Sequence, residues 1–131
     1  MAEAISGRND RKKINRHELG SRYEEEAAAF LADKGFQILE KNFRCRLGEI
    51  DLIAREGRYL VFVEVKYRSS RGCGDPTEAV ELKKQRRIVQ TARYYLLTHG
   101  LGEDMPCRFD VASILDGEFR LIRDAFWADS P

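Results

Sequence analysis

Apolar and polar positions alternate most clearly over residues 59–67, and this alternation predicts a β-strand. Three valines fall on one face of the strand, while Leu60 and Phe62 fall on the other. A strand that is apolar on both faces is typical of the middle of a sheet. Glu64 and Lys66 follow on the second face, so the strand brings two charged side chains into apolar surroundings. Burying such groups costs several kcal/mol each unless a partner or a metal compensates.

Two segments with helical periodicity flank the strands. The first is predicted to begin at Ser21, which can cap a helix, and to end near Lys34 before Gly35. The second is predicted over residues 75–98, because an Asp-Pro pair at its start supplies an N-cap and a favourable first helical residue. Its buried stripe is expected to consist of Leu82, Ile88, Val89, Ala92, Tyr95 and Leu96.

The remaining strands are predicted from shorter patterns. Residues 36–43 form one strand, and a second strand contains Glu49. Residues 107–115 and 118–126 form two more, joined by an Asp-Gly pair that is a good hairpin signal. The sequence therefore predicts an α/β protein with a mixed sheet of about five strands.

A hairpin between the second and third strands would gather the charged residues. Residues 55–58 supply the turn, with Gly57 able to adopt a positive φ. A loop of either two residues (56–57) or four (55–58) gives the same expected register. That register places opposite one another Glu49 and Glu64, Asp51 and Phe62, and Ile53 and Leu60. One end of this face would then hold three carboxylates and the ammonium of Lys66.

This excess of acid over base indicates a bound cation. Asp51 would lie on the diagonal from Glu64 with Cβ atoms roughly 7 Å apart, and two carboxylates can reach one ion across that gap. Magnesium, or manganese in its place, suits oxygen ligands and is commonly held by one or two carboxylates with substrate phosphate. A purely structural cross-strand ion network explains the geometry equally well. The charge excess favours the metal site.

The spacing of Asp51, Glu64 and Lys66, D-(x12)-E-x-K, resembles the PD-(D/E)xK core of restriction-endonuclease-like nucleases, with Ile50 where that pattern has proline. Longer segments resemble the YraN family of small bacterial proteins, which is largely uncharacterised and similar to archaeal Holliday junction resolvases. The segments that carry this resemblance are residues 20–36, 42–54, 61–68, 74–80 and 108–111. They extend over nearly the whole chain after about residue 15.

The resemblance implies a restriction-endonuclease-like fold, a central mixed five-stranded sheet flanked by helices, over residues 20–131. It implies that Asp51 and Glu64 bind the metal and that Lys66 orients the attacking water or stabilises the developing charge. Glu49 or Glu24 would position a water or a second ion. Glu24 follows Tyr23, where the YraN pattern usually has glycine, and this is closer to the resolvase form. Glutamates at residues 24–26 also suit a helix N-terminus without any catalytic role.

Charge distribution favours nucleic acid as the partner, and the resemblance to the resolvases implies DNA in particular. The net charge is only +1, which argues against a protein that coats DNA indiscriminately. The second predicted helix nevertheless concentrates cations, and with one arginine after the third strand they form the candidate phosphate contacts: Lys83, Lys84, Arg86, Arg87 and Arg68. Arg93 lies on the same helix. A solvated helix face is the alternative explanation for these cations.

Length and composition set the remaining expectations. The 131 residues suit one domain, preceded by a flexible basic arm over residues 1–19 that either touches phosphates or only aids solubility. No apolar run is long enough to span a bilayer, and no signal peptide is evident, so we expect a cytoplasmic protein without membrane contact. Three dispersed cysteines favour neither zinc nor disulfides.

The sequence thus favours a magnesium-dependent phosphodiester hydrolase, with branched DNA among its candidate substrates. Two alternatives stay open: a non-catalytic nucleic-acid-binding module that keeps the nuclease fold, and a protein-binding chain whose acids form a structural network. Because resolvases cut paired strands, the resemblance also implies a homodimer. Phe126 and Trp127 are candidates either for the core or for a contact with a second subunit. Asp110 belongs to the matching segments, but the sequence assigns it no role.

Overall fold

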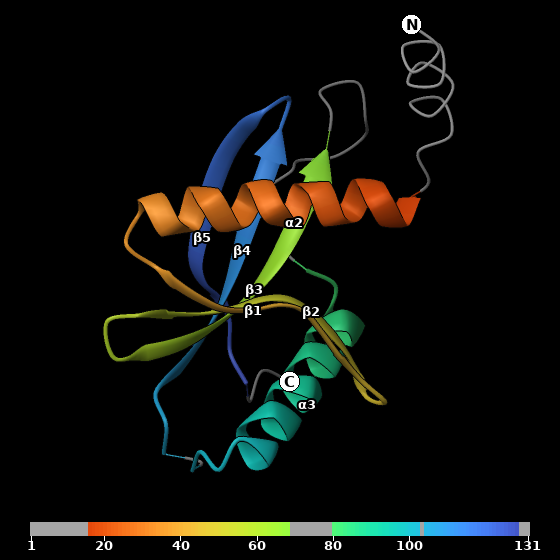
Figure 1. The fold of residues 1–131 in the computed structure, drawn as a ribbon. Helices are drawn as coiled ribbons and strands as arrows, with labels where there is room; N and C mark the ends of the chain where they lie inside the picture. Colours follow the sequence, from red (N-terminus) through yellow and green to blue (C-terminus); the bar gives the residue numbers. More distant parts are fainter. Residues whose placement is uncertain (1–15, 69–79, 103, 129–131) are drawn as a thin grey trace, which may run out of the picture.

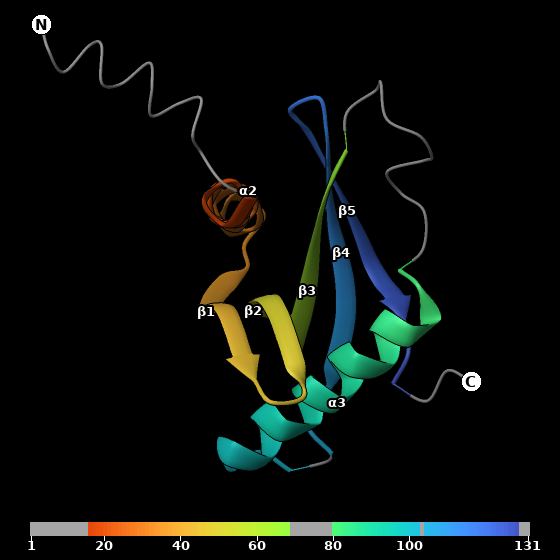
Figure 2. The same cartoon turned by 90° about the vertical axis from the view of Figure 1, so that its right-hand side faces the viewer.

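The computed structural model of the chain describes residues 16–68, 80–102 and 104–128. Its elements in chain order are α2 (Arg16–Asp33), β1 (Gln37–Cys45), β2 (Gly48–Glu56), β3 (Tyr59–Arg68), α3 (Leu82–Thr98), β4 (Cys107–Leu115) and β5 (Glu118–Phe126). Helix α2 crosses one face of the sheet (Figure 1). The view turned by 90° shows α3 on the other face, below the β1–β2 hairpin (Figure 2).

The five strands form one sheet in the order β1-β2-β3-β4-β5. Neighbouring strands are antiparallel except β3 and β4, which are parallel and are connected through α3. A helical crossover is the usual link between parallel strands, because a tight turn leaves the second strand antiparallel to the first. The predicted α/β class and mixed five-stranded sheet are confirmed, and the arrangement is consistent with a restriction-endonuclease-like fold.

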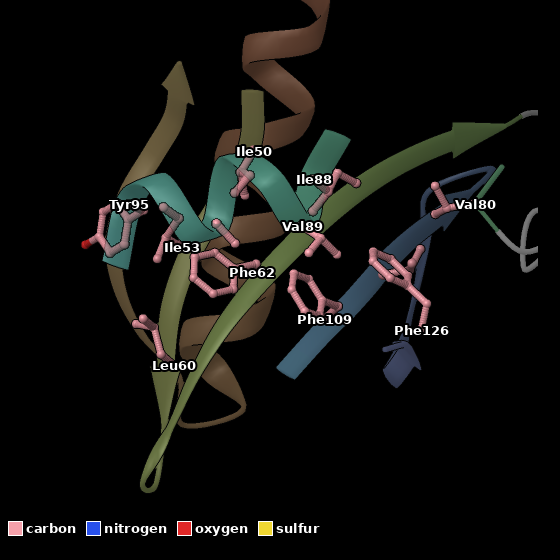
Figure 3. Packing of buried hydrophobic residues seen from close by; sticks show 12 residues of the cluster. Ile50, Ile53, Leu60, Phe62, Val80, Ile88, Val89, Tyr95, Phe109 and Phe126 are labelled. Carbon is pink, nitrogen blue, oxygen red and sulfur yellow. The ribbon is translucent and has the colours of Figure 1, made fainter. Parts of the chain in front are cut away.

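Strand β3 is buried on both faces, as its alternation predicted. Val61 and Val63 belong to the core beneath α2, whereas Leu60 and Phe62 belong to the core beneath α3. In the second core the Phe62 ring packs at 83° to that of Tyr95, which comes from α3 (Figure 3). The sheet is therefore the middle layer between two helices, and Glu64 continues the face of β3 that α3 covers.

Helix α2 begins earlier than predicted. It starts at Arg16, so Ser21 lies inside the helix and the predicted cap is wrong. Residues 1–15 of the predicted arm lie outside the described residues. The end of the helix is confirmed, since Gly35 has φ +101° and its N–H donates to the Ala32 carbonyl. A residue of positive φ ends the helix without steric cost only when it lacks a Cβ.

Helix α3 begins at Leu82 instead of residue 75. Glu81 has extended backbone angles (φ −57°, ψ 145°), and Val80 before it is buried in the α3 core. Val80 thus lies in the core just before the helix begins, and the Gln85 side chain donates a hydrogen bond to its carbonyl at 2.7 Å. Residues 75–79, which contain the predicted cap, lie outside the described residues. The predicted stripe is right at its centre but wrong at Leu82, which is 45% exposed.

The β2–β3 register differs from the prediction by two residues. Glu56 pairs with Tyr59, so the loop consists of Gly57 and the residue after it, with Gly57 at φ +61°. Ile53 then lies opposite Phe62, where Leu60 was expected. A shift of two preserves which side chains share a face, because successive residues of a strand point to opposite faces. The predicted faces are therefore right although the predicted partners are wrong.

Candidate active site

Asp51 lies where β2 and β3 separate. The paired residues of these strands end at Leu52 and Val63. Beyond that point the Val65 N–H donates to the Asp51 carboxylate oxygen Oδ2 at 2.8 Å. A side chain thus takes the place that a main-chain carbonyl of β2 would occupy in a continuous ladder. This bond fixes the Asp51 carboxylate beside β3.

Asp51 and Glu64 form a close acidic pair. The Glu64 side chain is only 8% exposed, and it lies on the face of β3 toward α3. Burial raises the pKa of Asp51 from its ordinary 3.8 to about 8, and the neighbouring Glu64 carboxylate adds to the effect. The Val65 N–H acts in the opposite direction, whereas Glu24 raises the pKa further. Asp51 therefore keeps its proton to a higher pH than an ordinary carboxyl group, and a shift of this kind is common at functional sites.

Lys84 reaches this pair from the first turn of α3. Its Nζ forms an ion pair with the Glu64 Oε2, and its side chain remains 55% exposed. Partial burial acts against the ammonium, but attraction to Glu64, and to Asp51 and Glu49 beyond it, raises the pKa of Lys84 overall. The sequence placed Lys84 among the phosphate contacts, whereas in the structure it contacts an acid of the predicted metal site.

The other predicted catalytic residues lie at different distances from the pair. Glu24 of α2 is near enough to raise the pKa of Asp51, so α2 brings a third acid close to the pair. Lys66 is half-buried and follows Glu64 by two residues on the same face of β3, about 6.6 Å along the strand. Glu49 is not opposite Glu64 as predicted. It pairs with Arg44 of β1, and its carboxylate lies 3.2 Å from the Arg44 Nε.

A cleft of about 550 Å³ lies between the β1–β2 turn and the start of α3. Asp51 and Glu64 do not line it, but Lys84, which contacts Glu64, does. Arg44 and Glu49 line it from the hairpin, and Lys83, Lys84 and Arg87 line it from α3. Four of these side chains are cationic, and a second acid besides Glu49, Glu81, also lines the cleft. A groove lined in this way beside an acidic pair suits a phosphate backbone whose scissile group must reach the carboxylates.

Gly48 allows the hairpin to approach α3 closely. A Cβ built on Gly48 would lie 2.9 Å from the Thr91 Oγ1 and 3.8 Å from the Arg87 Cβ. Thr91 is fully buried in spite of its hydroxyl, which donates to the Arg87 carbonyl at 2.8 Å. Any larger residue at position 48 would force the hairpin away from the helix. Gly48 therefore sets the width of the cleft.

The predicted cations of α3 are exposed, as expected for phosphate contacts: Lys83, Lys84, Arg86, Arg87 and Arg93. Arg86 and Arg93 are not among the residues that line the cleft. Arg68 ends β3, and its side chain lies outside the described part of the chain. Arg44 lines the cleft but was not among the predicted contacts. Its place was not evident because only the packing of the hairpin against α3 brings it to the cleft.

The acidic pair fits a divalent cation. Asp51 and Glu64 offer carboxylate oxygens, and Mg²⁺ or Mn²⁺ is usually completed by waters and substrate phosphate. In residues 16–68, 80–102 and 104–128, no three His, Cys, Asp or Glu side chains form a ready-made metal site. Burial and the neighbouring Glu64 carboxylate raise the pKa of Asp51, and a cation bound by both carboxylates would offset these two effects. Two protein ligands leave coordination positions for water and substrate oxygens.

Asp110 has a structural role that the sequence did not reveal. It is fully buried and accepts hydrogen bonds from Arg108 Nε at 2.9 Å and Nη2 at 2.8 Å. It also accepts the backbone N–H of Asp124, which has φ +56° where the β4–β5 register shifts. Arg108 in turn contacts Glu56 at the end of β2. Asp110 thus holds the irregular part of β5 in place.

No helix among the described residues is long and apolar enough to cross a membrane. The two described cysteines, Cys45 and Cys107, are both free thiols, as expected. Phe126 is buried in the α3 core, whereas the Trp127 side chain is 64% exposed. Of the two candidate contacts for a second subunit, only Trp127 is therefore accessible.

Comparison with known proteins assigns the chain to a family. The sequence profile of uncharacterised protein family UPF0102 matches residues 23–114. A UPF0102 protein of Lachnoclostridium phytofermentans is 56% identical over 113 residues, which cover 86% of this chain and 96% of that protein. One of Hahella chejuensis is 48% identical over 77% of this chain and 81% of its own length. A UPF0102 protein of Symbiobacterium thermophilum is also 48% identical, over 84% of this chain and 97% of its own length. The resemblance to the YraN family is confirmed, and the chain belongs to uncharacterised protein family UPF0102.

Proposed function

We propose that this protein is a metal-dependent nuclease that hydrolyses phosphodiester bonds in DNA. The observation that carries the proposal is the Asp51–Glu64 pair, which Lys84 connects to a cleft with four cationic side chains in its lining. A carboxylate pair alone would repel a phosphodiester. Combined with a divalent cation and flanking cations, the same pair becomes a phosphate-binding site.

The proposed mechanism assigns a role to each group. Asp51 and Glu64 would hold Mg²⁺ or Mn²⁺, which when bound supplies a Lewis acid and a template for the phosphate. Lys66, two residues beyond Glu64, would orient the attacking water or stabilise charge on the phosphate oxygens. Glu24 is a better candidate than Glu49 for positioning the water. Glu24 is close enough to raise the pKa of Asp51, whereas Glu49 forms an ion pair with Arg44.

The cleft would supply contacts that do not depend on base sequence. Lys83 and Arg87 line it and are exposed, as expected for side chains that bind phosphate oxygens. Arg44 faces them across the cleft from the hairpin. This arrangement favours a substrate recognised by the course of its backbone, such as branched DNA.

A second candidate function is a nucleic-acid-binding module without catalysis. The Lys84–Glu64 ion pair favours it, because an internal ammonium already neutralises part of the acidic pair. Such a protein would bind DNA through the same cleft but would need no metal. The two functions differ in one measurable respect: only the nuclease cleaves DNA, and a chelator should stop that cleavage.

A cleavage assay on labelled substrates tests the proposal. A four-way junction, a flap, single-stranded DNA and RNA would be incubated with Mg²⁺, with Mn²⁺ and with a chelator. Asp51→Asn, Glu64→Gln and Lys66→Met should each abolish cleavage in a folded protein. Glu25→Gln is the matched control, because Glu25 is exposed on α2 and contacts only the exposed Lys41 in the described contacts. Cleavage by the wild type that persists in chelator, or survives in Asp51→Asn, would contradict the proposal.

Two features of the setting follow from the same proposal. We expect a cytoplasmic protein that meets DNA directly. We also expect a homodimer, since the resolvases that it resembles cut paired strands. Light scattering on the full chain, with and without a four-way junction, measures the number of copies in the complex.

A further inference from the structure

We infer that Lys84 is a built-in counter-ion, which neutralises the acidic pair in the absence of metal and is displaced when a divalent cation binds. The inference rests on the proposed function, because it concerns the same acidic pair. It adds a residue from α3 to the control of metal loading. It also implies that metal and phosphate bind cooperatively, with Lys84 as the link.

The geometry places the Lys84 ammonium where a cation is needed. Its Nζ contacts the Glu64 Oε2, and this carboxylate is almost completely buried. Asp51 lies against Glu64 and is fixed by the Val65 N–H. An ammonium and a divalent cation that use the same buried oxygens compete for them. Lys84 therefore occupies part of the space in which a metal ligated by Glu64 would lie.

Lys84 can leave this position without any change in the fold. Its side chain is 55% exposed, and lysine carries its charge on a flexible four-carbon stem. The residue also lines the cleft, together with Lys83 and Arg87. A phosphate in the cleft would offer the displaced ammonium a new partner. Phosphate binding would then favour the displaced position, and hence metal binding, by linkage.

A substitution separates this role from a merely structural one. If Lys84 competes with the metal, removing its ammonium raises metal affinity, because the bound state is unchanged while the free state loses an ion pair. If Lys84 instead holds Glu64 in position for the metal, removing it lowers the affinity. For an ion pair with one buried partner we expect an increase of about tenfold.

The test is calorimetric titration of Mn²⁺ into the full chain without nucleic acid. Lys84→Met should bind Mn²⁺ about tenfold more tightly than the wild type. Lys84→Arg keeps the positive charge and should stay close to the wild type. Lys83→Met is the matched control, since Lys83 lines the same cleft but is not paired with Glu64 in the described contacts. Lys83→Met should change Mn²⁺ affinity by less than about twofold, because Lys83 acts on the metal only through screened long-range electrostatic repulsion.

Equal or weaker Mn²⁺ binding by Lys84→Met would overturn the inference, as would an equal gain in Lys83→Met. Absence of Mn²⁺ binding in both the wild type and Lys84→Met would also overturn it. The readout is independent of cleavage. If Lys84→Met binds Mn²⁺ more tightly but no variant cuts DNA, the counter-ion role stands and the nuclease proposal fails. If the wild type cuts DNA in a metal-dependent manner and Lys84→Met gains no Mn²⁺ affinity, the nuclease proposal stands and the counter-ion role fails.

Discussion

Replacing Asp51 with asparagine should stabilise the protein when no metal is present. The folded chain keeps a proton on Asp51 up to a pH of about 8, whereas the unfolded chain loses it near the ordinary pKa of 3.8. The folded state therefore binds more protons between these values, and stability falls as the pH rises through this interval. Below pH 3.8 the carboxyl is neutral in both states, so the penalty is absent. Above pH 8 the penalty is complete.

The size of the effect follows from the same interval. A pKa of about 8 in place of 3.8 corresponds to about 6 kcal/mol at full ionisation, at 1.36 kcal/mol per pH unit. Water and side chains relax around a newly formed charge, so we expect about 2–3 kcal/mol of this to be measurable. An asparagine Oδ1 can still accept the Val65 N–H, so the substitution removes the charge and keeps the hydrogen bond.

Urea unfolding of wild type and Asp51→Asn at pH 5 to 9, in chelator, measures this difference. The stability gain of the variant should increase with pH and reach its maximum near pH 8. Glu49→Gln is the control, because Glu49 is an exposed acid of the same strand and its replacement should change stability by less than about 0.5 kcal/mol. A destabilised Asp51→Asn protein, or a gain that does not depend on pH, would refute the burial and repulsion described for the acidic pair.

Three further predictions concern the framework of the site. Arg123, more than Arg108, lowers the pKa of Glu56 from 4.5 to about 2. The ionised Glu56 should therefore contribute about 1 kcal/mol of stability above pH 4.5, and this contribution should be lost as the pH falls toward 2. Acid unfolding should show a smaller loss in Arg123→Met. Asp110→Asn should lower the free energy of unfolding by about 2–4 kcal/mol in urea. Gly48→Ala should lower it by about 1–3 kcal/mol, partly restored by Thr91→Ala, which removes the hydroxyl that the new Cβ would meet.

Each of these has a contrary result. An acid transition that is identical in Arg123→Met would mean that this arginine does not control Glu56. An Asp110→Asn protein as stable as the wild type would exclude a buried ionic contact to Arg108. Additive losses in the Gly48 and Thr91 double variant would mean that the two residues do not meet.

The strands were predictable because their pattern is local. Alternation defined β4 and β5 at the bounds that the structure shows, and the Asp-Gly pair marked the turn between them. The two apolar faces of β3 identified the central strand in the same way. Each of these inferences needed only neighbouring residues and the period of a strand.

The register and the helix starts depended on distant contacts. Strand β2 continues to Glu56, which pairs with Tyr59, so the loop begins one residue later than the predicted two-residue loop. Arg108 and Arg123, some 50 to 70 residues later in the chain, bind the Glu56 carboxylate and hold it in this position. Val80 is buried in the core, Glu81 has extended backbone angles, and α3 begins only at Leu82, after the Asp-Pro signal. Local capping signals carry no information about either contact.

The candidate site was predictable as a set of acids but not as an arrangement. Asp51 and Glu64 share a site as expected, although the strands have separated where they meet. The contact between Lys84 and Glu64 could not be inferred, because it depends on how α3 lies across the sheet. A lysine in a basic helix has the same sequence signature whether it faces solvent, phosphate or a buried acid.

The most direct test of the central claim combines Mn²⁺ titration and DNA cleavage in the same samples of wild type and the Asp51→Asn/Glu64→Gln double variant. The proposed function predicts that the wild type binds the metal and cuts branched DNA. It predicts that the double variant remains folded and loses both activities together. DNA binding that persists in both proteins, with no metal uptake and no cleavage by the wild type, would contradict the nuclease and leave a binding module.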